Sequence, residues 1–364
     1  MKVAIVGAGN AGFAHAAKFS NIGHQVSLLK TSFSMHDDSF EVAKEQGGIR
    51  VLDSSLGGEQ YFARINVISR DPREVIQPDT NVVLVTVQSK FHAEVADLIA
   101  PYLVTDQLVI VAPGYMGSAI FKARCKAEGV IFAEGESLPF DARQMESGKV
   151  NVLWKNARNA LGFLPASRAE EGLAIARALL DTYSHRRTNI VESALHNPNL
   201  ILHTLGTLMS ASRIEYSQGD FWMYREAFTP SVLRLADGLD EEKNAVIAAY
   251  GGVPSHCLEE FKFRNEADLA IDRHEVLRKY ARDGGPKGPG DLRTRYLTED
   301  VPIGLGILIS LAEAANIDTP ISRAVLSLAS ALLGERFEDE ARTLEKLGLG
   351  GKSLPEIRSA LMGA

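Results

Sequence analysis

Short apolar runs alternate with segments of helical periodicity through the first half of the chain. The runs are rich in β-branched residues and are typical of buried strands; they cover residues 2–6, 25–29, 82–87, 108–112 and 130–133. Between them, apolar positions recur every three or four residues and predict helices at 11–22, 91–103 and 117–128. Continuous apolar strands that alternate with helices predict a parallel sheet with both faces covered.

Further strand candidates extend this alternation before the pattern changes. Residues 50–53 and 62–69 predict a hairpin-like insertion around Gly57 and Gly58, and 150–154 and 160–164 predict two added strands. From residue 167 onward helical patterns dominate, at 167–183, 198–215, 229–239, 241–250, 266–281, 304–316 and 321–333. The polar stretch 185–189 is therefore the predicted boundary between two domains.

Composition and charge narrow the class of protein. The 364 residues are 45% apolar and 23% charged, which is ordinary for a globular protein and sufficient for two cores. The net charge of -7 disfavours nucleic acid as a partner. Cys125 and Cys257 have neither disulfide-framework nor zinc spacing, and the apolar run 301–312 is shorter than the roughly 20 residues of a membrane helix. We expect a cytoplasmic protein without a metal or a membrane partner.

A glycine motif follows the first predicted strand directly. Gly7, Gly9 and Gly12 form G-x-G-x-x-G with Asn10 and Ala11 between them, and a helix follows. In such a turn the glycines allow a tight bend, close approach of a pyrophosphate and close packing of helix on strand. The motif and the alternating pattern predict an α/β Rossmann-type doubly wound parallel sheet in a dinucleotide-binding domain over 1–187. An all-helical substrate and catalytic domain would then occupy 188–364.

The end of the second strand bears on which dinucleotide binds. NAD-binding domains usually carry an acidic residue there for the ribose hydroxyls, whereas this chain has Lys30, Thr31 and Ser32. A cation and two hydroxyls suit a 2′-phosphate, so NADP(H) is favoured over NAD(H); a solvated lysine with NAD bound is the alternative. Val87 and Gln88 follow another strand, where the nicotinamide end of the cofactor is expected.

The helical half offers one candidate for proton transfer. His203 interrupts the apolar run 200–205, one to two turns after a helix start at Asn197 and Pro198. Histidine can serve as an acid or base near neutral pH, although the run alone favours a satisfied core histidine. Asp300 could orient such a histidine or could complement a helix N-terminus. The candidate carboxylate clamps, each of which could equally be a solvated arginine, are Arg143, Arg293 and Arg295.

Taken together, these motifs resemble the opine dehydrogenase family of octopine and nopaline dehydrogenase type. The resemblance spans nearly the whole chain and rests on residues 7–12, 113–114, 197–199 with His203, 229–232, 288–290, 295–301, 319–320 and 342–349. It implies reductive condensation of an amino acid with an α-keto acid such as pyruvate by NAD(P)H, giving a secondary amine dicarboxylate. The family's catalytic histidine and aspartate fall on His203 and Asp300, and Arg295 and then Arg143 become the substrate-binding candidates.

The chain departs from the family pattern at two positions. Lys30 stands where an acidic residue is expected, and Ser210 stands where asparagine is expected, so the amino-acid substrate does not transfer. The family also implies a homodimer through the helical domain, for which the apolar segment 305–311 is the candidate surface. Two other functions remain open: a dehydrogenase of a single 2-keto or 3-hydroxy acid, and a non-catalytic NAD(P)-sensing module.

Overall fold

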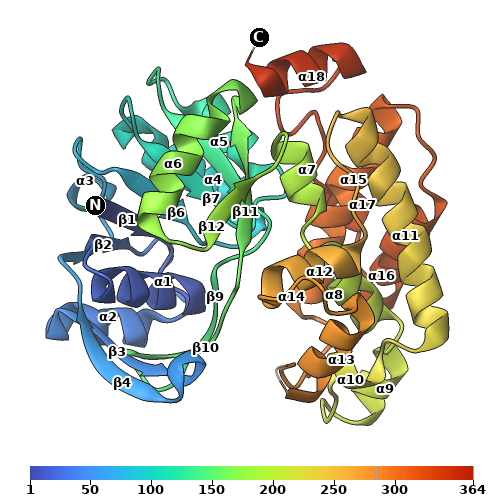
Figure 1. Cartoon of the computed structure of the whole chain (residues 1–364), viewed down its shortest axis with the longest axis horizontal. Helices are drawn as coiled ribbons and strands as arrows, with labels where there is room; N and C mark the ends of the chain where they lie inside the picture. Colours follow the sequence, from blue (N-terminus) through green and yellow to red (C-terminus); the bar gives the residue numbers. More distant parts are fainter. Residues whose placement is uncertain (284, 364) are drawn as a thin grey trace. The chain divides into compact units, whose positions relative to one another are not determined.

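In the computed structural model, residues 1–283 and 285–363 are described and form two units (Figure 1). The first unit comprises Met1–Arg186 with Gly363, and the second comprises Arg187–Met362. The structural division thus falls after Arg186, beside the predicted boundary at 187/188. This division lies within the stretch 185–189 that the sequence predicts as the boundary, and the first two residues of that stretch complete a strand that ends at Arg186.

The first unit is built on an eight-stranded sheet. Its order is β12 (Tyr183–Arg186), β11 (Asn159–Leu164), β8 (Ile131–Gly135), β7 (Leu108–Val111), β6 (Val82–Val85), β1 (Lys2–Val6), β2 (Gln25–Leu29), β5 (Val67–Ser69). Every pairing is parallel except β11 with β8. The helices of this unit are α1 (Asn10–Asn21), α2 (Asp37–Gln46), α3 (Pro72–Val75), α4 (His92–Ile99), α5 (Gly117–Arg124) and α6 (Ala169–Leu179). The predicted doubly wound Rossmann-type domain is confirmed, and β11 and β12 are added at one edge, antiparallel to the other six strands.

A second, four-stranded sheet occupies the same unit. Its order is β4 (Glu59–Arg64), β3 (Gly48–Asp53), β10 (Lys149–Lys155), β9 (Phe140–Gln144). β3 and β4 form the expected hairpin, in which Gly57 and Gly58 have φ of 75° and 89°. The single strand predicted at 62–69 is wrong, because the chain leaves this sheet after Arg64 and enters the large sheet at Val67.

The second unit is helical, as predicted. Its helices are α7 (Ile190–Leu195), α8 (Asn199–Leu208), α9 (Ala211–Tyr216), α10 (Met223–Glu226), α11 (Pro230–Ala249), α12 (Cys257–Asn265), α13 (Arg273–Asp283), α14 (Arg295–Thr298), α15 (Gly306–Ala314), α16 (Pro320–Leu333), α17 (Phe337–Glu340) and α18 (Leu354–Met362). A π-helical turn, η5 (Asp300–Leu305), precedes α15. In the part of the chain that the structure describes, no helix has the length and apolar character needed to cross a membrane.

Several predicted helices of the second unit have different limits in the structure. The segment 198–215 divides into α8 and α9 at Ser210, whereas 229–239 and 241–250 form the single helix α11. The helix predicted from 266 begins at Arg273, because the Asp272 carboxylate accepts hydrogen bonds from the backbone N–H groups of His274 and Glu275 and caps the helix there.

The segment 305–311, predicted as a dimer surface, lies in the core of the helical unit. Leu305, Ile307, Leu308 and Leu311 are fully buried within one chain. The surface assignment is therefore wrong. An unbroken apolar run marks a helix that is surrounded by neighbours, and here the run packs inside its own unit.

Candidate active site

The helical unit contains a buried histidine–aspartate pair. His203 lies in the second turn of α8, and its Nδ1 is 2.9 Å from Oδ2 of Asp300, the first residue of η5. The two side chains are 5% and 1% exposed, and 97 positions of sequence separate them. Upstream, the Asn197 side chain accepts the Asn199 backbone N–H at 3.0 Å and fixes where α8 begins.

Local backbone chemistry explains why Asp300 stands at a π-helical turn. Pro302 has no N–H, so it cannot make the usual bond to the carbonyl four residues earlier, and the turn widens. The Arg342 backbone N–H donates to the Pro302 carbonyl at 3.0 Å from a distant segment. The widened turn places the Asp300 carboxylate against α8.

Tyr296 completes the setting of the histidine. Its ring stacks on the His203 imidazole, with centroids 3.7 Å apart and planes inclined by 16°. The guanidinium carbon of Arg295 lies 5.5 Å from the centre of the Tyr296 ring. Nη1 of Arg295 is 3.8 Å from Oε2 of Glu299. The sequence reasoning missed Tyr296, although it directly follows Arg295 in the motif.

Electrostatics favour the neutral form of His203. Burial lowers its pKa below the ordinary 6.5, the hydrogen bond and charge of Asp300 act in the opposite direction, and the charges of Arg295 and Arg264 add to the lowering. Because Nδ1 faces a carboxylate, Nδ1 carries the donated proton and Nε2 is the atom that can exchange a proton with a substrate. Of the clamps proposed from sequence, Arg295 adjoins this pair, whereas Arg293 pairs with Glu335.

In the first unit, the glycine turn fits a dinucleotide pyrophosphate. Gly7 has φ of 111°, and a Cβ at Gly12 would lie 1.6 Å from the Gly7 carbonyl oxygen, so both positions require glycine. A Cβ at Gly9 would meet, among the described residues, only His36 Cδ2, at 3.9 Å. No side chain caps α1 at Gly9. The first N–H groups of a 12-residue helix thus face an open space, which is the arrangement that binds a pyrophosphate.

The neighbours of this turn are held by backbone contacts. The Asn10 side chain accepts the Gln144 backbone N–H at 2.7 Å, so its role is to attach β9 to the turn, while Ala11 lies in the first turn of α1. Val87 packs against Gly7, since a Cβ at Gly7 would be 3.0 Å from Val87 Cγ1. Gln88 is half-buried beside it.

Lys30 lies in a different environment from that expected. It is 3% exposed, and its Nζ is 2.6 Å from the Met35 carbonyl, 3.2 Å from Ser32 Oγ and 3.1 Å from Asp37 Oδ1. The buried Lys30 ammonium therefore holds together the loop after β2 through these three contacts. Thr31 and Ser32 are half-buried on that loop.

A second cation, Arg70, adjoins this loop and was missed from the sequence. It follows β5, which pairs with β2, and it donates to the Ser32 carbonyl and to Asp37 Oδ1, the latter at 3.2 Å. Its guanidinium lies 4.6 Å from the ring centre of Phe33. Arg143, the other substrate-binding candidate, is exposed on β9 of the same unit and donates to the Ala142 carbonyl.

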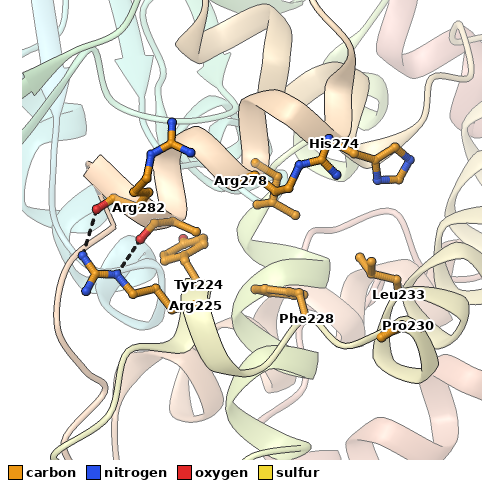
Figure 2. A pocket seen from close by; sticks show the side chains of 10 residues that line it. Tyr224, Arg225, Phe228, Pro230, Leu233, His274, Arg278 and Arg282 are labelled. Atoms are coloured by element: carbon orange, nitrogen blue, oxygen red, sulfur yellow. Dashed lines mark hydrogen bonds between the residues drawn. The ribbon is translucent and has the colours of Figure 1, made fainter.

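The helical unit also contains a groove of about 620 Å³ formed by α10, α11 and α13 (Figure 2). Tyr224, Phe228 and Leu233 supply apolar lining, and Arg225 donates to the Ala281 carbonyl at 2.7 Å. His203, Asp300 and Arg295 do not line it. The His203–Asp300 pair therefore lies outside this groove.

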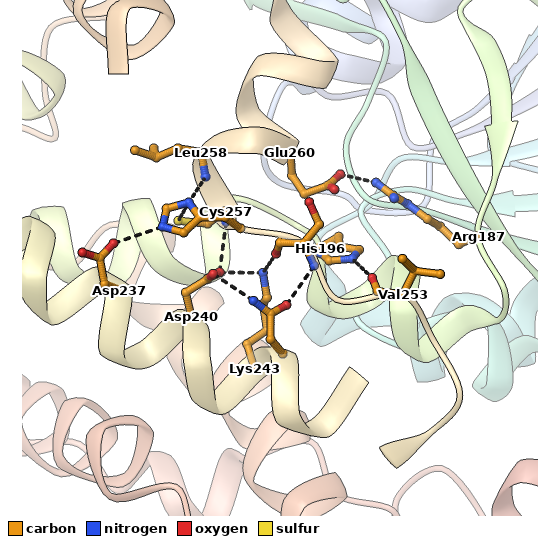
Figure 3. Close-up of polar contacts among 12 residues, drawn as sticks. Arg187, His196, Asp237, Asp240, Lys243, Val253, Cys257, Leu258 and Glu260 are labelled. Carbon is orange, nitrogen blue, oxygen red and sulfur yellow. Dashed lines mark hydrogen bonds and ion pairs between the residues drawn. The ribbon is translucent and has the colours of Figure 1, made fainter. Parts of the chain in front are cut away.

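A polar cluster between α11 and α12 brings Asp240, His256 and Cys257 within 4.8 Å of one another (Figure 3). Asp240 is bound to the Lys243 ammonium at 2.6 Å. His256 uses Nδ1 to accept the Leu258 N–H and Nε2 to contact Asp237. Burial raises the pKa of the Cys257 thiol to about 12. These donors are committed to structure and do not suit a metal ion.

A dinucleotide-binding α/β unit and a helical unit with a buried histidine–aspartate pair define a two-domain NAD(P)-dependent oxidoreductase. The model for the family described as NAD/NADP octopine/nopaline dehydrogenase, alpha-helical domain, matches residues 186–333, and that described as NADP oxidoreductase coenzyme F420-dependent matches residues 2–114. The chain is 34% identical over 366 residues to an opine dehydrogenase of Arthrobacter sp. (strain 1C), covering 98% of both chains. It belongs to the opine dehydrogenase family, whose reaction is NAD(P)H-dependent reductive condensation of an amino acid with an α-keto acid.

Solved structures show the same fold. A structure of octopine dehydrogenase with NADH and agmatine has a TM-score of 0.78 at 18% identity and covers 100% of this chain and 98% of that chain. Yersinopine dehydrogenase with NADP⁺ bound has a TM-score of 0.68 at 15% identity and covers 100% of this chain and 97% of that chain. The two-domain architecture therefore occurs with either dinucleotide bound.

Proposed function

We propose that His203 is the proton-transfer residue of this opine dehydrogenase and that Asp300 orients it. The observation that carries the assignment is the buried Nδ1–Oδ2 contact of 2.9 Å. It fixes the imidazole, directs Nε2 to the substrate and stabilises the imidazolium when it forms. Burial, together with the charges of Arg295 and Arg264, lowers the pKa of His203 and favours the neutral imidazole at rest.

In the condensation direction, the amino group of the amino acid adds to the carbonyl carbon of the keto acid and forms a carbinolamine. His203 takes at Nε2 the proton that the substrate ammonium gives up as the amine adds, and returns it to the departing hydroxyl, so that water leaves and a protonated imine remains. When bound, the reduced nicotinamide supplies the hydride that reduces the imine carbon. Arg295 binds the keto-acid carboxylate in this proposal, and Arg143 is the second candidate for a carboxylate contact.

Amine dependence distinguishes this reaction from reduction of a keto acid alone. With pyruvate present, we expect oxidation of the reduced cofactor to require an added amino acid and the product to be a secondary amine dicarboxylate. Absorbance at the nicotinamide band, with mass spectrometry of the product, measures both. Equal oxidation with and without any amino acid would instead identify a single-substrate keto-acid reductase.

We further propose that NADP(H) is preferred over NAD(H). The end of β2 carries Lys30 in place of a carboxylate, and the hydroxyl groups of Thr31 and Ser32 lie on the loop that Arg70 adjoins. The Asp37 carboxylate contacts both Lys30 and Arg70 and offsets part of their positive charge. The preference therefore depends on Arg70, whose side chain is 23% exposed, more than on the buried Lys30.

An Arg70→Gln substitution tests this preference. We expect it to weaken NADPH binding about 10-fold relative to NADH, because a charge-assisted contact to the 2′-phosphate is lost. Fluorescence titration with both cofactors measures the ratio. The matched control is Arg73→Gln, since Arg73 pairs with Asp71 on the exposed side of α3. Equal weakening of both cofactors would show that Arg70 only supports the loop.

Two further proposals follow from the motifs. Within the family, residues 197–203, 229–232 and 342–349 are similar to N-(1-D-carboxyethyl)-L-norvaline dehydrogenase, and we propose a relationship to that enzyme. A screen of amino acids with pyruvate identifies the substrate. We also propose a homodimer through the helical unit, at a surface other than the buried segment 305–311.

A further inference from the structure

Phe33 lies on the loop between β2 and α2 and is 81% exposed. A single exposed apolar residue is common on a protein surface, so exposure alone assigns no role to it. The Phe33 ring, however, lies against a cation. The guanidinium carbon of Arg70 is 4.6 Å from the centre of the Phe33 ring and 4.7 Å from that of the buried Phe40 ring. Arg70 thus connects the exposed ring to the core, and the rest of the Phe33 ring stays open to solvent.

Hydrogen bonds fix the Arg70 guanidinium in this position. It donates to the carbonyl of Ser32, the residue before Phe33, and to the carboxylates of Asp37 and Glu41, each at 3.2 Å. A cation held in this way favours one placement of the ring that lies on it. The Phe33 ring is therefore exposed and yet supported in a defined place.

The loop that carries Phe33 borders the glycine turn. The Gly7 N–H donates to the carbonyl of Leu29, the last residue of β2, at 2.9 Å. Further along the loop, His36 Cδ2 is 3.9 Å from the position that a Cβ would take at Gly9. Because a pyrophosphate binds at this turn, the loop lies beside the phosphates of a bound dinucleotide.

The strand order indicates which end of the dinucleotide lies over this loop. β1 has β2 on one side and β6 on the other, and the two halves of a dinucleotide lie on opposite sides of such a switch point, with the adenosine over the strand that follows the glycine turn. β5 continues the sheet beyond β2, and the Lys30 N–H donates to the Ser69 carbonyl at 3.0 Å. Phe33 and Arg70, which follow these two strands, therefore lie at the adenosine end.

We propose that the adenine ring of the cofactor stacks on Phe33, an inference that rests on the proposed cofactor site. Adenine is planar and aromatic, so stacking covers the open part of the phenylalanine ring. Arg70, beside it, supplies positive charge for a ribose 2′-phosphate. NAD(H) and NADP(H) carry the same adenine. Phe33 therefore supports the binding of both dinucleotides to the same extent, whereas Arg70 discriminates between them.

Phe33→Ala tests the proposal through binding, without turnover. We expect NADPH and NADH each to bind about 10-fold more weakly, with the ratio of their dissociation constants unchanged within about twofold, because one base-stacking contact is lost from both. Isothermal titration calorimetry measures the two constants. Adenosine 2′,5′-bisphosphate should lose affinity by a similar factor. Nicotinamide mononucleotide, which has no adenine, should bind as it does to the unmodified protein.

Two further variants serve as controls. Phe33→Tyr keeps an aromatic ring and should keep the affinity for both dinucleotides within about twofold. Phe62→Ala removes another exposed phenylalanine, on β4 of the small sheet, and should leave both affinities unchanged. Because Phe33 is exposed, its replacement leaves the core intact, and an unchanged midpoint of urea unfolding verifies this.

Three results would overturn the inference: unchanged affinities in Phe33→Ala, a loss confined to NADPH, or an equal loss for nicotinamide mononucleotide. A loss confined to NADPH would show that Phe33 only supports Arg70. Equal binding of NADPH and NADH to the unmodified enzyme would contradict the proposed cofactor preference instead. It would leave the prediction for Phe33 intact, because both dinucleotides carry adenine.

Discussion

Replacing His203 with alanine is expected to lower kcat for reductive condensation by about 100-fold or more, because general acid–base catalysis contributes about 10²- to 10⁴-fold. The alanine leaves no group able to donate a proton to the departing oxygen or to take one in the reverse reaction. Cofactor binding should be unchanged, since the glycine turn belongs to the other unit. Steady-state kinetics in both directions, together with cofactor titration, measure these effects.

The Asp300→Asn substitution tests the role of Asp300 in orienting His203, while His203 remains present to transfer the proton. The Asp300 charge raises the pKa of His203, so its loss lowers that pKa further. Less imidazolium is then present at a given pH, and the condensation profile should move to lower pH with a reduced maximum. A His203→Ala enzyme with nearly full activity would contradict the assignment and place proton transfer elsewhere. An unchanged pH profile in Asp300→Asn would show that the pair does not titrate together.

Lys243→Met is expected to lower the free energy of unfolding by about 3–5 kcal/mol, the range for breaking a buried ion pair. Lys243 and Asp240 have side chains only 1% and 3% exposed, and their contact of 2.6 Å lies at the centre of the cluster in Figure 3. Removing the ammonium leaves the Asp240 carboxylate buried without its cation. Urea unfolding followed by circular dichroism measures the loss.

A second substitution at the same pair distinguishes charge from packing. Lys243→Met combined with Asp240→Asn removes both charges and should recover part of the stability, because the amide oxygen can still accept the Cys257 backbone N–H that Asp240 accepts. An exposed pair, Arg336 with Asp339, is the comparison, and Arg336→Gln should change stability little. A loss below about 1 kcal/mol in Lys243→Met would contradict the argument.

Local patterns were sufficient for the architecture of the first unit. The central strands of the large sheet, β1, β6 and β7, are apolar and buried on both faces, so their composition alone indicates a parallel sheet with helices on both sides. Gly7 and Gly12 are required by backbone geometry within six consecutive positions, which is why the motif can be identified without coordinates. The hairpin around Gly57 is equally local. Neighbouring residues do not set where these strands end. The chain leaves the small sheet and enters the large one around Asn66, and this change depends on the strands with which each segment pairs, β3 and β2.

The sequence by itself determined the two-domain plan, the glycine turn and the candidacy of His203. Only the tertiary structure decided that Asp300 and Tyr296 hold that histidine, that Lys30 is buried while Arg70 adjoins the loop after β2, and that 305–311 is core. Hydrophobic period and turn chemistry arise between neighbouring residues, so a sequence displays them directly. The environment of a charged or titratable side chain depends on groups tens of positions away, and folding alone brings those groups together.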